Sequence, residues 1–175
     1  MNTSPFQKYI ARFESLQEIP TEKELRNCIE GLSREQFSID QYIMFSEHEY
    51  KRNIIYTSSK CELVILCFKP GQYTPIHDHG GSVGIAFIYE GIMTEELFDK
   101  QLSSGMIVPS VKKLCSANEA SCIDVTTIHR VSNTHNDGLV ALNIYLPPLT
   151  SMNIYNLKNI QIEKWTAESF GKQDS

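Results

Sequence analysis

Roughly the first forty residues carry apolar positions at helical spacing. Ser4-Pro5 supplies an N-cap and a first-turn proline, and the first apolar stripe runs as far as Pro20, which ends the predicted helix. Thr21 with Glu24 three residues later forms a capping box, which predicts a second helix to about residue 31 or 32. We expect both helices to pack against a sheet through their apolar faces, which comprise Phe6, Tyr9, Ile10, Phe13 and Leu16 in the first and Leu25, Cys28, Ile29 and Leu32 in the second.

From about Tyr50 the pattern changes to short apolar or alternating runs that are separated by turn residues. This spacing is typical of a sandwich or small barrel, and the strand-then-long-helix repeat of a parallel sheet is missing from the sequence. We therefore expect one domain over residues 1–175, with a helical segment over 1–45 and a β-barrel over 50–165. The expected strands cover residues 63–68, 83–89, 92–98, 106–108, 121–126, 129–133 and 139–146.

The composition and net charge of the chain limit the kinds of partner that we expect it to bind. The chain has 175 residues, of which 41% are apolar and 21% charged, with a net charge of −5. No Lys/Arg cluster is dense enough to follow a phosphate backbone, so we expect small-molecule partners and no nucleic acid. The N-terminal sequence lacks a basic stretch followed by an apolar one, and no run approaches the roughly 18 apolar residues of a membrane span. We expect a cytoplasmic monomer with no membrane partner.

The five cysteines form an odd set without a Cys-x-x-Cys pair. In a reducing compartment this pattern favours small buried thiols over disulfides or thiolate metal ligands. We assign them no chemistry.

Three histidines form a candidate metal site. His77 and His79 follow the Pro70-Gly71 turn, and alternate residues of a strand face the same way, so their imidazoles can converge on one ion. His129, from another expected strand, supplies a third donor. The two remaining histidines, His48 and His135, adjoin polar residues in expected loops, where we predict solvated side chains.

The ligand set alone leaves the metal open. Zinc takes three histidines plus water, which permits a hydrolase or lyase. Ferrous iron in oxygen-activating enzymes more often takes two histidines and a carboxylate. A wholly neutral donor set keeps the full +2 charge of the ion, and this favours an anionic incoming ligand such as a thiolate.

At this point the residues resemble a known family. The stretch Gly71-x5-His77-x-His79 is similar to the first motif of the cupin barrels, except that Val83 and Gly84 stand where the usual glutamate would lie. Over roughly residues 50–155, four landmarks in order resemble those of the cysteine dioxygenases, in the thiol dioxygenase family. These landmarks are Tyr50-Lys51-Arg52-Asn53, Ile76-His77-Asp78-His79, Ile128-His129-Arg130-Val131-Ser132-Asn133 and Tyr145-Leu146-Pro147-Pro148.

The resemblance implies an all-β cupin barrel, a small barrel or jelly roll, with N-terminal helices. It implies one non-haem iron(II) on His77, His79 and His129. It also implies that both atoms of dioxygen are added to the thiol of L-cysteine, giving cysteine sulfinate. Two alternatives stay open: dioxygenation of another small thiol, 3-mercaptopropionate or cysteamine, and a non-catalytic metal-binding cupin module.

The same resemblance assigns roles around the metal. Arg52 matches the arginine that binds the substrate carboxylate, a position where the related 3-mercaptopropionate dioxygenases carry glutamine. Tyr145 matches the active-site tyrosine near substrate and oxygen, and Tyr50 is a candidate for the pocket wall. The alternatives are a surface arginine and a core tyrosine.

The sequence departs from the family pattern at two places. Gly84 stands where animal enzymes have the cysteine that crosslinks to the tyrosine, so we expect a bacterial-type enzyme without that thioether. Ala141 and Asn143 replace the serine and histidine of the family relay; an asparagine can hydrogen-bond the hydroxyl of Tyr145 but cannot carry a proton as imidazole does. The pair Pro147-Pro148 resembles the family's proline pair, and the peptide bond before it is a candidate cis bond.

Overall fold

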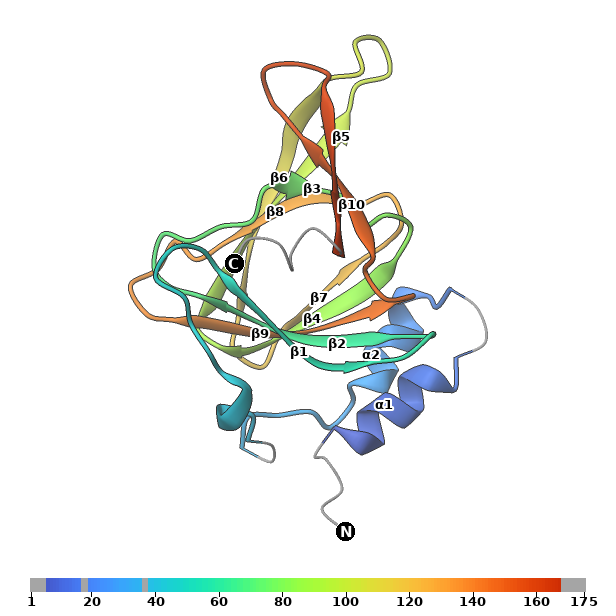
Figure 1. The fold of residues 1–175 in the computed structure, drawn as a ribbon, viewed down its shortest axis with the longest axis vertical. Helices are drawn as coiled ribbons and strands as arrows, with labels where there is room; N and C mark the ends of the chain where they lie inside the picture. Colours follow the sequence, from blue (N-terminus) through green and yellow to red (C-terminus); the bar gives the residue numbers. More distant parts are fainter. Residues whose placement is uncertain (1–5, 17–18, 36–37, 168–175) are drawn as a thin grey trace.

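The computed structural model describes residues 6–16, 19–35 and 38–167. Two antiparallel sheets face each other across an interior, and two short helices cover the outer face of one of them (Figure 1). The predicted class, an all-β core with N-terminal helices, is confirmed.

The helices are shorter than predicted. Helix α1 (Gln7–Glu14) begins after Phe6, whereas the expected cap Ser4-Pro5 lies outside the described residues. Helix α2 (Glu22–Cys28) has the predicted capping box of Thr21 and Glu24 but ends about three residues early. The chain that follows α2 reaches Gly31, whose φ of +80° is a left-handed backbone conformation that ends an α-helix. A 3-10 turn, η1 (Asp40–Tyr42), leads to the sheet. Within the described residues, the helices all fall short of the length and apolar character that a bilayer crossing needs.

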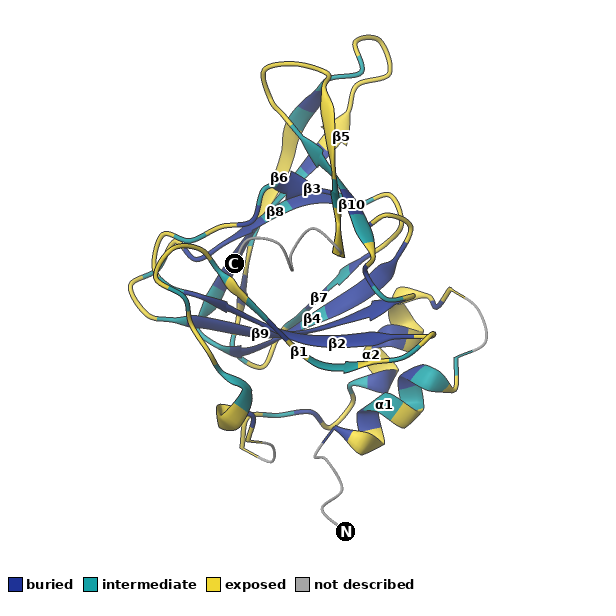
Figure 2. Ribbon diagram, viewed as in Figure 1, coloured by how far each residue is buried: buried dark blue, intermediate teal, exposed yellow. Residues whose placement is uncertain are grey.

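The helices pack on a five-stranded sheet with the order β1-β2-β9-β4-β7. Strands β2 and β9 are buried at every position, because the helices cover one face and the second sheet covers the other (Figure 2). This two-sided burial explains why their sequences are continuous apolar runs rather than alternating ones. The strands are β1 (Lys51–Thr57), β2 (Glu62–Phe68), β9 (Leu139–Leu146), β4 (Val83–Glu90) and β7 (Ala120–Ile123).

The second sheet has six strands in the order β11-β10-β3-β8-β5-β6. The β5–β6 hairpin and the β10–β11 hairpin extend beyond the barrel, and their outer parts are largely exposed (Figure 2). The strands are β11 (Ile162–Thr166), β10 (Ser151–Tyr155), β3 (Ile76–His77), β8 (Ile128–Ser132), β5 (Ile92–Lys100) and β6 (Ile107–Ser116). Strands β10 and β11 were not predicted individually, and β6 is much longer than the predicted 106–108.

Two apolar clusters give the molecule its layers. One lies between the helices and the outer face of the five-stranded sheet and contains Phe6, Phe13, Leu25, Ile65 and Ile144. The other fills the barrel interior between the sheets and contains Val64, Phe68, Met93, Ala141 and Tyr145. The predicted helix faces belong to the first cluster, as expected, and the second cluster surrounds the predicted metal ligands.

Candidate metal centre

The structure brings the three predicted histidines together inside the barrel. His77 on β3 lies directly opposite His129 on β8, and His79 follows two residues after His77. The centroids of the three rings are 4.8–4.9 Å apart, and one potential ligand nitrogen from each residue lies within 4.8 Å of the others. All three are buried, with relative exposures of 6%, 2% and 6%. His48 is exposed and His135 half-buried, and neither belongs to the cluster.

The His-x-His spacing works because the residue between the histidines is fastened to the neighbouring strand. Strand β3 ends at His77, so the prediction that both histidines lie within one strand is wrong for His79. The backbone stays in register through Asp78, whose N–H donates to the Asn153 carbonyl at 3.1 Å. The Asp78 carboxylate accepts from the Asn153 backbone, the Asn153 side chain and the Tyr155 hydroxyl at 2.8–3.0 Å. Asp78 therefore faces outward and both imidazoles face inward.

Hydrogen bonds fix the orientation of two of the rings. Nδ1 of His77 lies 2.9 Å from the Pro75 carbonyl, and Nδ1 of His129 lies 2.6 Å from Oε1 of Glu95. In each case Nδ1 carries the proton, so Nε2 presents its lone pair to the cluster. Burial, followed by the neighbouring His129, lowers the pKa of His77 to about 3 and that of His79 well below its usual value.

Glu95 is a functional residue that the sequence prediction missed. It lies on β5, is 1% exposed, accepts a hydrogen bond from Ser121 at 2.7 Å and forms an ion pair with Lys113 at 3.1 Å, besides its bond to His129. Burial raises the pKa of Glu95, but the hydrogen bonds that it accepts from His129 and Ser121, with the charge of Lys113, lower it to about 2. The carboxylate is therefore ionised and orients the third histidine from outside the ligand set.

The residues fit a divalent transition metal. Among the described residues, Nδ1 of His79 is buried without a hydrogen-bond partner, and three neutral imidazoles are a donor set that zinc and iron both accept. The cluster borders an interior cavity of about 30 Å³. Apolar side chains dominate its wall, which includes Leu66, Phe68, Ile85, Met93, Ile123, Val131 and Ala141. A metal-bound ligand here would be shielded from bulk water.

Tyr145 lines the same cavity beside His79. Its ring is 5.8 Å from the His79 ring at an interplanar angle of 25°. Burial raises the pKa of Tyr145, so the phenol stays protonated and can donate a hydrogen bond. On β4, Gly84 lies directly opposite Tyr145, and a Cβ built on it would come within 3.0 Å of Cδ1 of that ring. The glycine at this position therefore allows the tyrosine to pack closely.

The expected bond between Asn143 and Tyr145 does not form among the described residues. Nδ2 of Asn143 donates instead to the Ala141 carbonyl at 3.1 Å. A short amide side chain can bond the backbone of its own strand in this way. The Leu146–Pro147 peptide is cis, as the proline pair predicted.

Arg52 and Tyr50 lie at the β1 end of the interior. Arg52 faces inward, directly opposite Leu66 of the interior cluster, so the alternative of a surface arginine is wrong. Its guanidinium forms an ion pair with Glu62, which no pattern in the sequence predicted. Tyr50 stacks on Phe68 with ring centroids 4.9 Å apart. Of the predicted site residues, Arg52 and Tyr50 do not line the described cavity, whereas the histidines and Tyr145 do.

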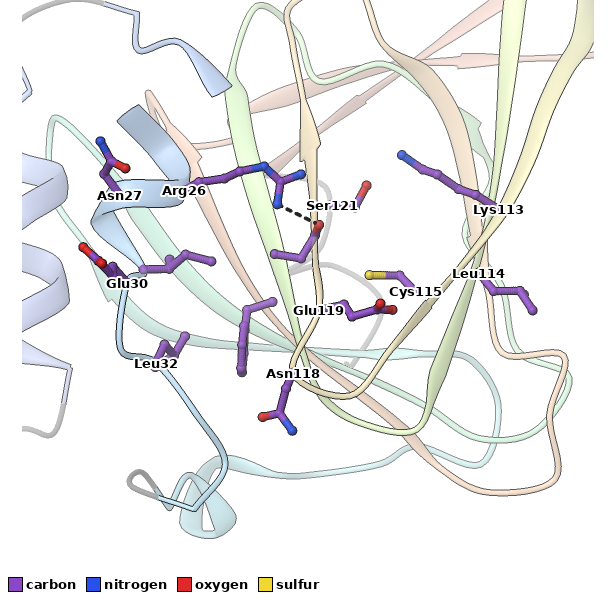
Figure 3. A pocket seen from close by; sticks show the side chains of 13 residues that line it. Arg26, Asn27, Glu30, Leu32, Lys113, Leu114, Cys115, Asn118, Glu119 and Ser121 are labelled. Atoms are coloured by element: carbon purple, nitrogen blue, oxygen red, sulfur yellow. Dashed lines mark hydrogen bonds between the residues drawn. The ribbon is translucent and has the colours of Figure 1, made fainter. Parts of the chain in front are cut away.

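A separate open groove of about 730 Å³ lies on the outside, between α2 and the strands β6 and β7 (Figure 3). Arg26 of α2 crosses it and donates to the Ala120 carbonyl at 3.3 Å. Lys113 and Ser121 stand on its strand side, and both bind Glu95. Among the described residues, these contacts through Glu95 join the groove to the histidine cluster.

Comparisons with known proteins agree with this geometry. The family described as cysteine dioxygenase type I matches residues 9–158. A cysteine dioxygenase type 1 from Danio rerio is 30% identical over 140 residues, which cover 77% of this chain and 69% of the relative. The Rattus norvegicus protein of the same name is 32% identical over 119 residues, covering 66% of this chain and 60% of the relative.

Solved structures support the fold alone. The protein TT1209 from Thermus thermophilus aligns with a TM-score of 0.54 at 15% identity, covering 64% of this chain and 96% of that chain. A Klebsiella pneumoniae protein with a double-stranded β-helix domain aligns with a TM-score of 0.51 at 17% identity, covering 63% and 88% of the two chains.

Proposed function

The chain belongs to the cysteine dioxygenase type I family, and from that premise we propose that it is an iron(II) enzyme that oxidises the thiol of L-cysteine. Both atoms of one dioxygen molecule would enter the product, so that a thiol R–SH and O₂ give the sulfinic acid R–SO₂H with no other reductant. The observation that carries the proposal is the convergence of His77, His79 and His129 on one buried point.

The metal is assigned by the chemistry that the family performs. Iron(II) supplies the one-electron reactivity that ground-state dioxygen needs to combine with a thiolate. His77, His79 and His129 would hold the ion through neutral nitrogens and leave its +2 charge uncompensated, which favours ionisation of an incoming thiol. The apolar wall would exclude water from the reacting sulfur.

Three further side chains are proposed to contact the substrate. Arg52 would receive the substrate carboxylate through guanidinium N–H groups, and Tyr50 would form the wall beside it. The hydroxyl of Tyr145, kept protonated by burial, would donate a hydrogen bond to the negative charge that develops near the sulfur. Asn143 bonds its own strand, so Tyr145 would act here without a relay partner.

The test is product analysis with labelled dioxygen. Protein loaded anaerobically with ferrous iron should consume oxygen with cysteine and give a sulfinate in which both new oxygen atoms carry the label. Metal-free protein and zinc-loaded protein are the controls, and both should be inert. Absence of oxygen uptake with cysteine, cysteamine and 3-mercaptopropionate would instead favour the non-catalytic metal-binding module, and tightly held zinc would support the hydrolase or lyase alternative.

A further inference from the structure

The chain has one tryptophan, and it covers the guanidinium that is proposed to bind the substrate. Trp165 lies on β11, and Cζ of Arg52 on β1 is 6.0 Å from the centroid of its ring. The half-buried ring also packs against the apolar cluster that fills the barrel interior. Strand β11, the dark red strand in Figure 1, belongs to the six-stranded sheet, whereas β1 belongs to the five-stranded sheet. The contact between Trp165 and Arg52 therefore joins the two sheets across the interior.

Arg52 in turn leads to the wall of the metal cavity. It lies opposite Leu66 in the β1–β2 ladder, but its Nη2 donates to Oε2 of Glu62. The side chain therefore runs along the inner face of β2, toward the position that lies directly opposite Tyr145 in the β2–β9 ladder. Tyr145 lines the cavity together with the three histidines. Trp165, Arg52 and Tyr145 thus form a row from a partly exposed side chain to the cavity.

The cavity is too small for the proposed substrates. Its volume of about 30 Å³ has room for about two water molecules, whereas cysteine and dioxygen together are much larger. Arg52, which is proposed to bind the carboxylate, does not line the cavity. Part of the surrounding structure must therefore move before a thiol can reach the histidines and Arg52 at the same time.

Strand β11 is the part of the surroundings that is held by few buried side chains. It forms the edge of its sheet, and four of its five residues are exposed while Trp165 is half-buried. Strands β2 and β9, in contrast, are buried at every position. Toward β7, the bonds of Glu95 to Ser121 and Lys113 hold the wall. Segments with few buried contacts open at the lowest cost, so β11 should open before these other parts.

We propose that β11 is a gate to the metal cavity and that Trp165 holds this gate closed over Arg52. When β11 moves away, the guanidinium is uncovered, and a thiol with a carboxylate can bind there while its sulfur passes Tyr145 toward the histidines. The cation–π contact and the packing of the ring favour the closed position. The gate closes over the loaded site as it does over the empty one, so it limits the rates of entry and exit and leaves the affinity unchanged. The inference rests on the proposed function, because it describes how the substrate of the same site enters.

The test measures how fast cysteine binds and leaves. The protein is loaded anaerobically with cobalt(II), which binds nitrogen ligands at least as tightly as iron(II) and shows a thiolate charge-transfer absorption when sulfur binds. In stopped-flow mixing, Trp165→Ala should raise the association and dissociation rate constants by the same factor, about tenfold, because the closed position loses its main contact. The dissociation constant of cysteine should stay that of the wild type.

Two further variants serve as controls. Lys164→Ala removes an exposed side chain next to Trp165 on the same strand and should leave both rate constants unchanged. Trp165→Phe keeps an aromatic ring over Arg52, so its rate constants should lie closer to those of the wild type than to those of Trp165→Ala.

A measurement on the unmodified sequence covers the case in which Trp165→Ala does not fold. Since Trp165 is the only tryptophan of the chain, quenching of its emission by acrylamide reports the exposure of this ring alone. Urea at concentrations below the unfolding transition should increase the quenching and the rate of cysteine binding in parallel, because both require that β11 opens. A binding rate that stays constant while the quenching rises would overturn the gate.

The outcomes separate this inference from the proposed function. A higher dissociation constant with an unchanged association rate in Trp165→Ala would overturn the gate and assign Trp165 to positioning Arg52, and wild-type rates in this variant would overturn it as well. Oxygen uptake by the iron-loaded wild type decides the proposed function separately. Gated binding without oxygen uptake would retain the gate and reject the dioxygenase, whereas uptake with ungated binding would do the reverse. Absence of the thiolate absorption at every cysteine concentration would reject both.

Discussion

At the scale of single residues, the convergence of the three histidines could be predicted, but their hydrogen-bonding partners could not. Two histidines separated by one residue, with a third on a later strand, are visible in the sequence because the strand repeat puts alternate residues on one face. Glu95 and Glu62 are separated from their partners by 34 and 10 residues, and only the strand register shows which charges meet. The partner of a buried carboxylate therefore depends on which strands pair and in which register, and the sequence alone does not determine this.

The role of Glu95 leads to a prediction about metal affinity. Replacing Glu95 by Gln keeps the side-chain length but removes the negative charge that orients His129 and makes its ring more basic, so affinity for a divalent metal should fall about 10- to 100-fold. Competition with a chromogenic chelator measures this loss. Glu22→Gln, which breaks the exposed pair of Glu22 with Arg26, is the control and should bind metal as the wild type does.

A purely structural role for Glu95 would give a different result. In that case Glu95→Gln would lower the melting temperature of the metal-free protein while leaving the chelator competition unchanged. Glu95→Asp, which retains the charge, should recover part of the affinity if orientation and charge are what matter.

At the scale of elements, the strands with clear boundaries were predicted best. Strand β9 was predicted over 139–146 and has those bounds, because a turn sequence precedes it and prolines follow it. The β10–β11 hairpin was missed because its strands are short and partly exposed, and so give little apolar pattern. Helix α2 was predicted too long because its apolar stripe continues past the point where the backbone turns.

The turn after His79 is an element on which the site depends. Gly80 has φ +58°, and a Cβ there would lie 2.3 Å from the Ser151 carbonyl oxygen. The variant Gly80→Ala should therefore lose about 1–3 kcal/mol of unfolding free energy from the backbone conformation alone. The clash with β10 should also displace His79 and weaken metal binding, as measured by urea unfolding together with metal titration.

Gly31→Ala separates the two effects of this substitution. Gly31 has φ +80°, but a Cβ there would meet no atom within 4 Å. This control should also lose unfolding free energy because of its backbone conformation, but it should keep the metal affinity of the wild type. Equal metal affinity in both variants would show that the position of His79 does not depend on the close approach of Gly80 to β10.

At the scale of the whole molecule, the barrel imposes a pH dependence on the metal-free protein. Burial depresses the pKa of His77 to about 3 and lowers that of His79 strongly, whereas both would titrate near 6.5 in the unfolded chain. Below about pH 6.5 the unfolded chain binds protons that the folded protein does not. The unfolding free energy should therefore decrease as the pH falls from about 6.5 toward 3, by up to about 1.4 kcal/mol per pH unit for each histidine.

Urea unfolding of the metal-free protein at several pH values measures this slope. His77→Gln removes one of the two titrating groups and should make the slope between about pH 6.5 and 5 shallower. Bound metal should raise the unfolding free energy at every pH at which His77 and His79 of the folded protein stay unprotonated, because the metal binds the folded state. A slope in His77→Gln equal to that of the wild type would mean that other groups cause the acid sensitivity.

The β10–β11 hairpin has a consequence for how this site can change. Asn153 and Tyr155 of β10 hold Asp78, the residue between His77 and His79, by hydrogen bonds. Trp165 of β11 covers the guanidinium of Arg52. Five register pairs join these two strands, from Ser151 opposite Thr166 to Tyr155 opposite Ile162. A shift of this hairpin would therefore change the positions of His77 and His79 and, at the same time, the surroundings of the ion pair between Arg52 and Glu62. A change of this hairpin that adapts the site to a new thiol would thus also affect how the site holds a metal.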